Sequence, residues 1–147
     1  MALSNRDRIG KMFELLAPSL DDYISSVIGA VDQAAGAQWT KLIEARDGDT
    51  GRVYDPLDPA AQLRMLTDTS ITTRFQPRWY PFSDTLGRIG EAFATELKNA
   101  RNTWAHNGSF TDDDAYRILD TAERLVGLIN AGGTVADDLK AIRLDLR

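Results

Sequence analysis

The chain has no cysteine and a single histidine, and these two scarcities limit its chemistry more than any other feature of composition. Without cysteine there is no disulfide, no thiolate nucleophile and no cysteine-ligated metal. One histidine alone supplies too few nitrogen ligands for a zinc site. The sequence also has no glycine-rich phosphate-binding loop, so this chain is not itself predicted to bind a nucleotide cofactor. We therefore expect neither a metal nor an organic cofactor.

Long apolar stretches are missing as well. No segment approaches the unbroken run of about twenty apolar residues that a membrane span needs. The opening MALSNRDRIG lacks the apolar core of a signal peptide. We expect a soluble, cytoplasmic protein with no membrane partner. Its 147 residues, 43% hydrophobic and 27% charged, are typical of one globular domain, and we expect a single domain over residues 1–147.

Helix signals account for most of the chain. Capping patterns recur before apolar residues at helical spacing. They are Ser4 with Asp7, Ser19 with Asp22, Asp58 with Pro59, Thr111 with Asp114, and Thr134 with Asp137. No alternating pattern is strong enough to build a sheet. The sequence predicts an all-α bundle of four or more helices with short accessory helices.

Proline, glycine and asparagine mark the expected boundaries. We expect Pro18 to break the first helix, 47–58 to form a loop, and 69–82 to be an ordered, irregular connection. The longest predicted helix starts at Ser83 and stops at Asn107-Gly108, residues that tolerate the left-handed conformation. The last amphipathic stretch reaches the end of the chain without a stop signal. We therefore expect this domain to come from the N-terminus of a longer protein.

Negative charge predominates, with a net charge of −5, which argues against tight, non-specific binding to nucleic acid. The segment from Arg74 to His106 is the exception, because it holds five basic and three acidic residues. It is the one mildly basic part of the chain.

The same segment carries the clearest candidate for chemistry, the sequence RNTWAH at 101–106. On a helix, Asn102 and His106 lie on one face, one turn apart, and Arg101 lies about 100° round from Asn102. The arginine side chain is long enough to reach the same cleft. Near a helix end the dipole favours the imidazolium form of His106. A guanidinium binds phosphate oxygens in a bidentate way and histidine exchanges protons near neutral pH, so the pattern predicts a phosphate site.

This spacing resembles the motif of the HEPN superfamily, in which an arginine is followed after four to six residues by a histidine. Four segments resemble one branch of it, named for a eukaryotic endonuclease of messenger-RNA quality control. They are NRDRIGKMFELLAP, the leucine-rich turn after Asp58, ELKNARNTWAH, and FTDDDAYRILDTAERL. In bacteria this branch recurs at the N-terminus of large ATPases, some of them linked to phage defence. The likeness covers most of the chain and is loosest from Gly29 to Arg52 and around Trp79.

The resemblance implies a helical bundle, often a homodimer, that cleaves RNA without metal. The RNA 2′-OH would attack the adjacent phosphate, with His106 as general base or acid and Arg101 stabilising the developing charge. Asn102 would orient the phosphate or His106. Two motifs would line one cleft of the dimer. The mildly basic segment would then face the RNA, which makes Arg78, Arg88 and Lys98 candidate RNA-binding residues.

Two other interpretations stay open. A HEPN fold can dimerise, bind RNA or bind a partner domain, such as an ATPase, without cutting. Alternatively, Arg101 pairs with Glu91 or Glu96 and His106 caps its own helix. Exposed Arg101 and His106 side chains that converge in a cleft favour the enzyme, whereas buried intramolecular pairs favour an interaction domain.

Weaker patterns have structural explanations. Asp47, Asp49 and Asp58 fall at calcium-loop spacing, but Arg52 occupies the position that requires glycine. The acidic run at 112–114 suits a helix start. We expect Trp39 and Trp104 in the core or at a dimer interface. Trp79 and Tyr80 either stack on RNA bases or anchor an irregular loop.

Overall fold

The structure is a computed structural model that describes residues 3–48, 50–71 and 80–146. Within these ranges the chain forms seven α-helices and no β-strand. They are α1 (Asn5–Gly29), α2 (Gln33–Ala37), α3 (Thr40–Asp47), α4 (Pro59–Thr67), α5 (Ser83–Ala105), α6 (Asp112–Leu128) and α7 (Val135–Leu144). The predicted all-α bundle with short accessory helices is confirmed.

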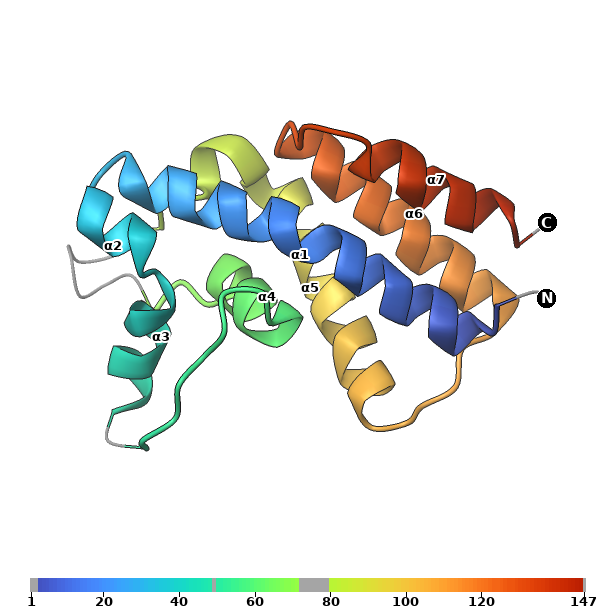
Figure 1. The fold of residues 1–147 in the computed structure, drawn as a ribbon, viewed down its shortest axis with the longest axis horizontal. Coiled ribbons are helices and arrows are strands. Elements are labelled where there is room, and N and C mark those ends of the chain that lie inside the picture. Colours follow the sequence, from blue (N-terminus) through green and yellow to red (C-terminus); the bar gives the residue numbers. More distant parts are fainter. Residues whose placement is uncertain (1–2, 49, 72–79, 147) are drawn as a thin grey trace.

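Helix α1 is the axis of the bundle. It crosses the molecule diagonally in Figure 1, with α6 and α7 along one side and α4 on the other, while α5 passes behind it from one side to the other. It packs against α2, α4, α5, α6 and α7, while α5 is held between α4 and α6. The short helices α2 and α3 gather at the end of α1 that lies farthest from the start of α6. The end of α5 is thereby fixed against α1 and α6.

One continuous hydrophobic core joins the long helices. Most of its fully buried side chains come from α1, α4, α5, α6 and α7, and include Ile9, Met12, Leu16, Leu20, Ile24, Leu63, Leu66, Leu97, Leu119, Leu125 and Leu139. Trp39 is also buried, and its indole N–H donates to Asp21 Oδ1 at 2.8 Å. The predicted core position of Trp39 is confirmed.

The predicted break at Pro18 is wrong, because α1 continues through it to Gly29. A proline inside a helix removes one backbone hydrogen bond and costs about 3 kcal/mol or more. Leu16, Ala17 and Leu20, on both sides of the exposed proline, are buried. Burying aliphatic side chains contributes roughly 1.5–3 kcal/mol each, so packing on both sides outweighs the lost bond. Ser19 is therefore a mid-helix residue and caps nothing.

Other local predictions hold. The Ser4 hydroxyl accepts from the Asp7 N–H at 3.0 Å and starts α1, and Asp58 Oδ1 accepts from the Ala60 N–H at 3.0 Å and starts α4. α5 begins at Ser83 and α7 follows Thr134, but the side-chain caps predicted at these two positions do not form. The N-cap residue of α5 is Phe82, and the Thr134 hydroxyl donates to Asp138 Oδ2 at 2.9 Å instead of accepting from the Asp137 N–H. Of the irregular segment 69–82, residues 72–79 lie outside the described part. None of the described helices is long and apolar enough to cross a membrane.

The acidic residues of the predicted loop are used structurally. Asp47 accepts two hydrogen bonds from the Arg64 guanidinium, at 2.6 and 3.0 Å, and one from the Tyr54 hydroxyl at 2.6 Å. These bonds hold the pKa of Asp47 well below its usual range. Asp49, the second residue of the calcium-like spacing, lies outside the described residues. Among those described, no three acidic or histidine side chains are grouped to hold a metal ion.

Candidate functional site

The motif lies in the last turns of α5. Arg101 and Asn102 are helical, and His106 is the C-cap residue, with φ −97° and ψ 22°. The His106 N–H still donates to the Asn102 carbonyl at 3.1 Å. The backbone therefore keeps Asn102 and His106 one turn apart on the same face, as predicted, and both side chains are exposed.

A complete Schellman motif ends this helix. The Gly108 N–H donates to the Thr103 carbonyl at 2.8 Å and the Asn107 N–H to the Trp104 carbonyl at 3.3 Å. Asn107 has φ 59°, the left-handed conformation that such an end requires. A Cβ atom on Gly108 would come within 2.4 Å of the Thr103 side chain, so this close approach needs glycine. The predicted stop at Asn107-Gly108 is confirmed, and it fixes the backbone of His106.

A reciprocal pair of hydrogen bonds holds the same end against α1. The Arg6 guanidinium donates to the Trp104 carbonyl at 2.7 Å, and the Trp104 indole N–H donates to the Arg6 carbonyl at 3.2 Å. The guanidinium also lies over the indole ring, 4.9 Å from its centroid. Trp104 is half-buried and lies against Gly10 of α1. It packs within the chain, and its contacts leave the motif on a rigid support.

Arg101 points away from the exposed face that carries Asn102. It is half-buried and lines a groove of about 340 Å³ with Phe13, Leu57 and Trp104. Because each helical residue adds about 100°, Arg101 and His106, five residues apart, lie about 140° apart around the axis of α5. Within one chain the structure thus brings Asn102 and His106 together on one face, while Arg101 leaves the helix on the side of α1 and α4.

The intramolecular pairing considered for Arg101 does not occur with Glu96. That carboxylate is held by Arg117 and by the Thr121 hydroxyl, which donates at 2.9 Å. These bonds lower the pKa of Glu96. Among the described residues, no hydrogen bond or ion pair involves the Arg101 guanidinium, and no side-chain bond involves His106. Both groups are therefore available to a ligand.

The candidate RNA-binding cations are partly placed. Arg88 is exposed and Lys98 half-buried on α5, each within about 40° of Asn102 around the helix axis. Arg78 and Trp79 lie outside the described residues. The Tyr80 hydroxyl donates to the Leu66 carbonyl, and burial raises its pKa. Of the two roles considered for Tyr80, the structure favours the anchoring of the chain against α4 over stacking on RNA bases.

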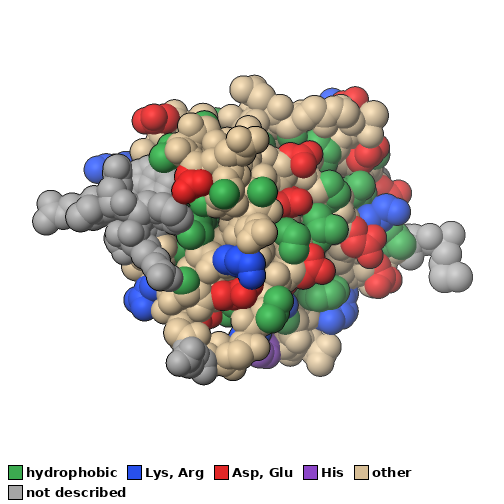
Figure 2. Space-filling model, turned by 60° about the vertical axis from the view of Figure 1, so that its left-hand side comes forward, with side chains coloured by type: hydrophobic (Ala, Val, Ile, Leu, Met, Phe, Trp, Pro, Cys, Tyr) green, Lys and Arg blue, Asp and Glu red, His purple; other side chains and the backbone are tan. Residues whose placement is uncertain are grey.

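Charge on the surface is mixed. On the face shown in Figure 2, lysine and arginine side chains stand singly, with aspartate and glutamate side chains between them. This distribution agrees with the net charge of −5. The face shown has no continuous basic band of the kind that binds a nucleic-acid backbone regardless of sequence.

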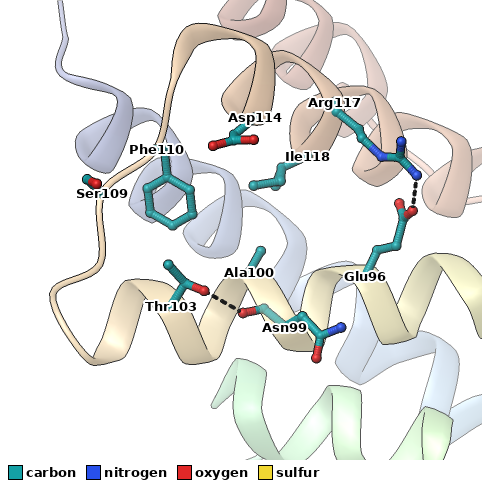
Figure 3. Close-up of a pocket in the computed structure, with 9 residues that line it drawn as sticks. All are labelled: Glu96, Asn99, Ala100, Thr103, Ser109, Phe110, Asp114, Arg117 and Ile118. Carbon is teal, nitrogen blue, oxygen red and sulfur yellow. Dashed lines mark hydrogen bonds and ion pairs between the residues drawn. The ribbon is translucent and has the colours of Figure 1, made fainter.

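A second groove, between α5 and α6, was not predicted from the sequence. Its volume is about 340 Å³, and its lining comes from α5, the loop after it and the first turns of α6 (Figure 3). The lining residues are Glu96, Asn99, Ala100, Thr103, Ser109, Phe110, Asp114, Arg117 and Ile118. Asn99 lies three residues before Asn102, and Thr103 lies three residues before His106. Residues three apart are neighbours on a helix surface, so this spacing could have indicated from the sequence that Asn99 and Thr103 lie next to the motif.

Fold and motif together define a class: a helical bundle with Arg-Asn and a histidine four residues later, placed at the capped end of a central helix. The family model described as Swt1-like HEPN matches residues 11–130. The chain belongs to this family, which confirms the resemblance to HEPN domains. Searches of curated proteins and of solved structures gave no match.

Proposed function

We propose that this domain is a metal-independent endoribonuclease. The RNA 2′-OH attacks the adjacent phosphate, the bond to the 5′ oxygen breaks, and the products carry a 2′,3′-cyclic phosphate and a 5′-OH. His106 serves as general base or acid, and Arg101 stabilises the charge that develops on the phosphate oxygens. Asn102 orients the phosphate or the imidazole. The domain would act within a longer cytoplasmic protein, next to a partner such as an ATPase, in RNA surveillance or phage defence.

The observation that carries this proposal is that the Arg101 and His106 side chains are free to bind a ligand while the backbone that bears them is held in place. Arg101 and His106 are without side-chain partners among the described residues, whereas the helix end that bears them is fixed by the Schellman motif and the Arg6–Trp104 bonds. Catalysis by positioned groups requires rigid placement of free functional side chains. A purely structural arginine and histidine would instead be expected in intramolecular pairs.

A homodimer is part of the proposal, since one chain directs Arg101 and His106 to different sides of α5. The exposed face of α5 carries small uncharged side chains, among them Ala92, Thr95 and Asn102, between the charged Arg88 and Lys98. Packing this face against a second copy brings two motifs into one cleft. An arginine of one chain then lies near a histidine of the other, which one chain alone does not achieve.

RNA cleavage in EDTA tests the proposal. The variants are His106→Ala, Arg101→Ala and, as a matched loss of positive charge on the exposed face of α7, Lys140→Ala. We expect cleavage by the wild type and by Lys140→Ala, and a loss of at least a hundredfold in the two motif variants, each with an unchanged circular dichroism spectrum. Cleavage that survives in folded His106→Ala contradicts the proposal.

A second candidate function is a HEPN module that binds RNA or a partner without cutting. The mixed surface charge and the net charge of −5 favour it, because little of the described surface attracts RNA by charge alone. RNA binding or dimerisation without cleavage by any of the proteins above would support this second function. A catalytic domain needs little intrinsic affinity when another domain delivers the RNA.

A further inference from the structure

The groove between α5 and α6 has the composition of a site for a flat ring with polar edges. Its apolar lining is Phe110, Ala100 and Ile118, and in Figure 3 the Phe110 ring projects into it from the loop that follows α5. Asp114 enters from the first turn of α6, beside Phe110 and across the groove from α5. Aromatic side chains next to hydrogen-bonding groups are the usual means by which proteins hold unpaired bases.

The walls of the groove are fixed. The Asn5 amide donates to the Phe110 carbonyl at 3.1 Å and to Asp112 Oδ1 at 2.8 Å, which ties the loop and the start of α6 to α1. Asp114 and Thr111 form a capping box, in which Asp114 Oδ2 accepts from the Thr111 N–H at 3.1 Å. These bonds fix the backbone of the loop and of the start of α6, which form one wall of the groove.

One strong acceptor faces the groove without a partner. The capping box uses Oδ2 of Asp114, and no bond to its Oδ1 occurs among the described residues. The other carboxylate, Glu96, is occupied by Arg117 and Thr121. Asn99 and Ser109 supply neutral polar groups at the rim. The groove thus favours a ligand that donates hydrogen bonds and lies against an aromatic ring.

The groove is next to the motif. Asn99 and Thr103 lie three residues before Asn102 and His106, about 4.5 Å along the same helix. Around the axis of α5, the exposed Asn102 and His106 lie between Arg101 on one side and the groove on the other. A phosphate at the motif therefore places a neighbouring base within reach of the groove.

We propose that this groove binds one unpaired RNA base that carries an exocyclic amino group, adenine, cytosine or guanine, and disfavours uracil. This inference rests on the proposed function for its ligand class. The amino group donates to Asp114 Oδ1 while the ring packs on Phe110. Uracil presents two carbonyl oxygens around a single N–H, so it directs acceptors at a carboxylate that can only accept. Asp114 is thus a specificity-determining residue and Phe110 is the stacking surface.

Titration followed by NMR tests the groove independently of cleavage. The ligands are 2′-O-methyl hexanucleotides of adenine, cytosine or uracil, whose blocked 2′ oxygen prevents cutting. We expect the adenine and cytosine hexamers to shift the Asn99 side-chain amide and Phe110 ring signals, with affinity about tenfold above that of the uracil hexamer. Equal affinity for the three, shifts confined to other surfaces, or no binding overturns the inference.

Asp114→Asn sharpens the test. Its amide oxygen can keep the cap, while its NH₂ group can donate to a uracil carbonyl, so we expect the preference against uracil to disappear or reverse. Asp113→Asn is the matched control, because Asp113 is exposed one residue away and does not line the groove. We expect it to keep the wild-type preference, and an unchanged preference in folded Asp114→Asn contradicts the assignment.

The two proposals fail in different ways. Hexamer binding with the expected preference but no RNA cleavage removes the catalytic function and leaves the base site. If RNA cleavage depends on His106 but is equally fast next to each of the four bases, the base-binding site is contradicted and the catalytic function stands.

Discussion

At the scale of single residues, the conformation of glycine fixes how α5 begins. Gly87, inside α5, has φ 61° and ψ −169°, a region open almost only to glycine. The backbone therefore bends after the first turn of α5, and Arg88 to Ala105, which keep helical backbone angles, carry the motif. A side chain at Gly87 meets no atom within 4 Å, so only the backbone conformation opposes one.

Replacing Gly87 by alanine is expected to destabilise the fold by about 1–3 kcal/mol, because a Cβ atom strains that conformation. Gly127→Ala is the matched control. Gly127 lies in α6 with open space around it and a negative φ, so alanine there is expected to stabilise by about 0.4–1 kcal/mol. Urea unfolding measures both. Equal effects of the two substitutions would show that the bend at Gly87 is relaxed.

At the scale of helices, the contact between α1 and α5 positions the motif. Arg6 and Trp104 are joined by two hydrogen bonds in opposite directions and by the stacking of guanidinium on indole. A contact of this kind is cooperative, since each partner orders the other.

A double-mutant cycle with Arg6→Ala and Trp104→Phe measures that cooperativity. Each single variant is expected to lose about 1–2 kcal/mol of unfolding free energy, with a coupling energy of about 1 kcal/mol between them. Urea unfolding of the four proteins gives the value. Strictly additive losses would mean that the two residues stabilise the helix end independently.

The contact between Asp47 of α3 and Arg64 of α4 makes the stability of the fold depend on pH. The pKa of Asp47 is lowered in the folded protein, first by its hydrogen bond to Arg64 and then by that to Tyr54. The bonds therefore stabilise the fold fully above the unfolded value of 3.8, and the stabilisation is lost as the pH falls through the lower folded value.

Asp47→Asn is expected to be less stable than the wild type at pH 7, with the difference shrinking below about pH 4. Asp22→Asn, at an exposed carboxylate of α1, serves as the control and is expected to change little at any pH. Thermal melting between pH 3 and pH 7 follows both. A difference for Asp47→Asn that is constant over this range would show that the ion pair does not contribute.

The sequence was informative where structure is local. Caps at Ser4, Asp58 and Thr111 and the stop at Asn107-Gly108 depend on chemistry within four residues, and all were predicted. The break at Pro18 was mispredicted because burial along α1, a long-range effect, offsets a local penalty. The motif itself was visible as a spacing, and its family is confirmed.

Features that join distant segments could not be read from the sequence. The direction of Arg101, toward the groove with Phe13 and Leu57, follows from how α1 and α4 pack on α5. The groove between α5 and α6 joins Asn99 to Asp114 across the turn after α5. Helical periodicity gives the face of a residue, but only packing shows what lies opposite that face.

At the scale of the whole molecule, the proposal requires two copies. Ala92 is exposed on the face of α5 proposed to meet its symmetry mate, and Ala136 is exposed on α7, away from it. We expect a dimer in analytical ultracentrifugation, a monomer without RNA cleavage for Ala92→Arg, and wild-type behaviour for Ala136→Arg, because a buried unpaired charge opposes association. A dimer that tolerates Ala92→Arg would place the interface elsewhere.

The most direct test of the central claim is single-turnover cleavage, in EDTA, of one RNA and of the same RNA with a 2′-deoxy nucleotide at the cut position. The account predicts that the wild type cuts only the RNA that keeps its 2′-OH, leaving a 2′,3′-cyclic phosphate, and that folded His106→Ala cuts neither. Cleavage of the deoxy substrate, or equal cleavage by His106→Ala, would contradict the assignment of the Arg101–His106 motif as a ribonuclease site.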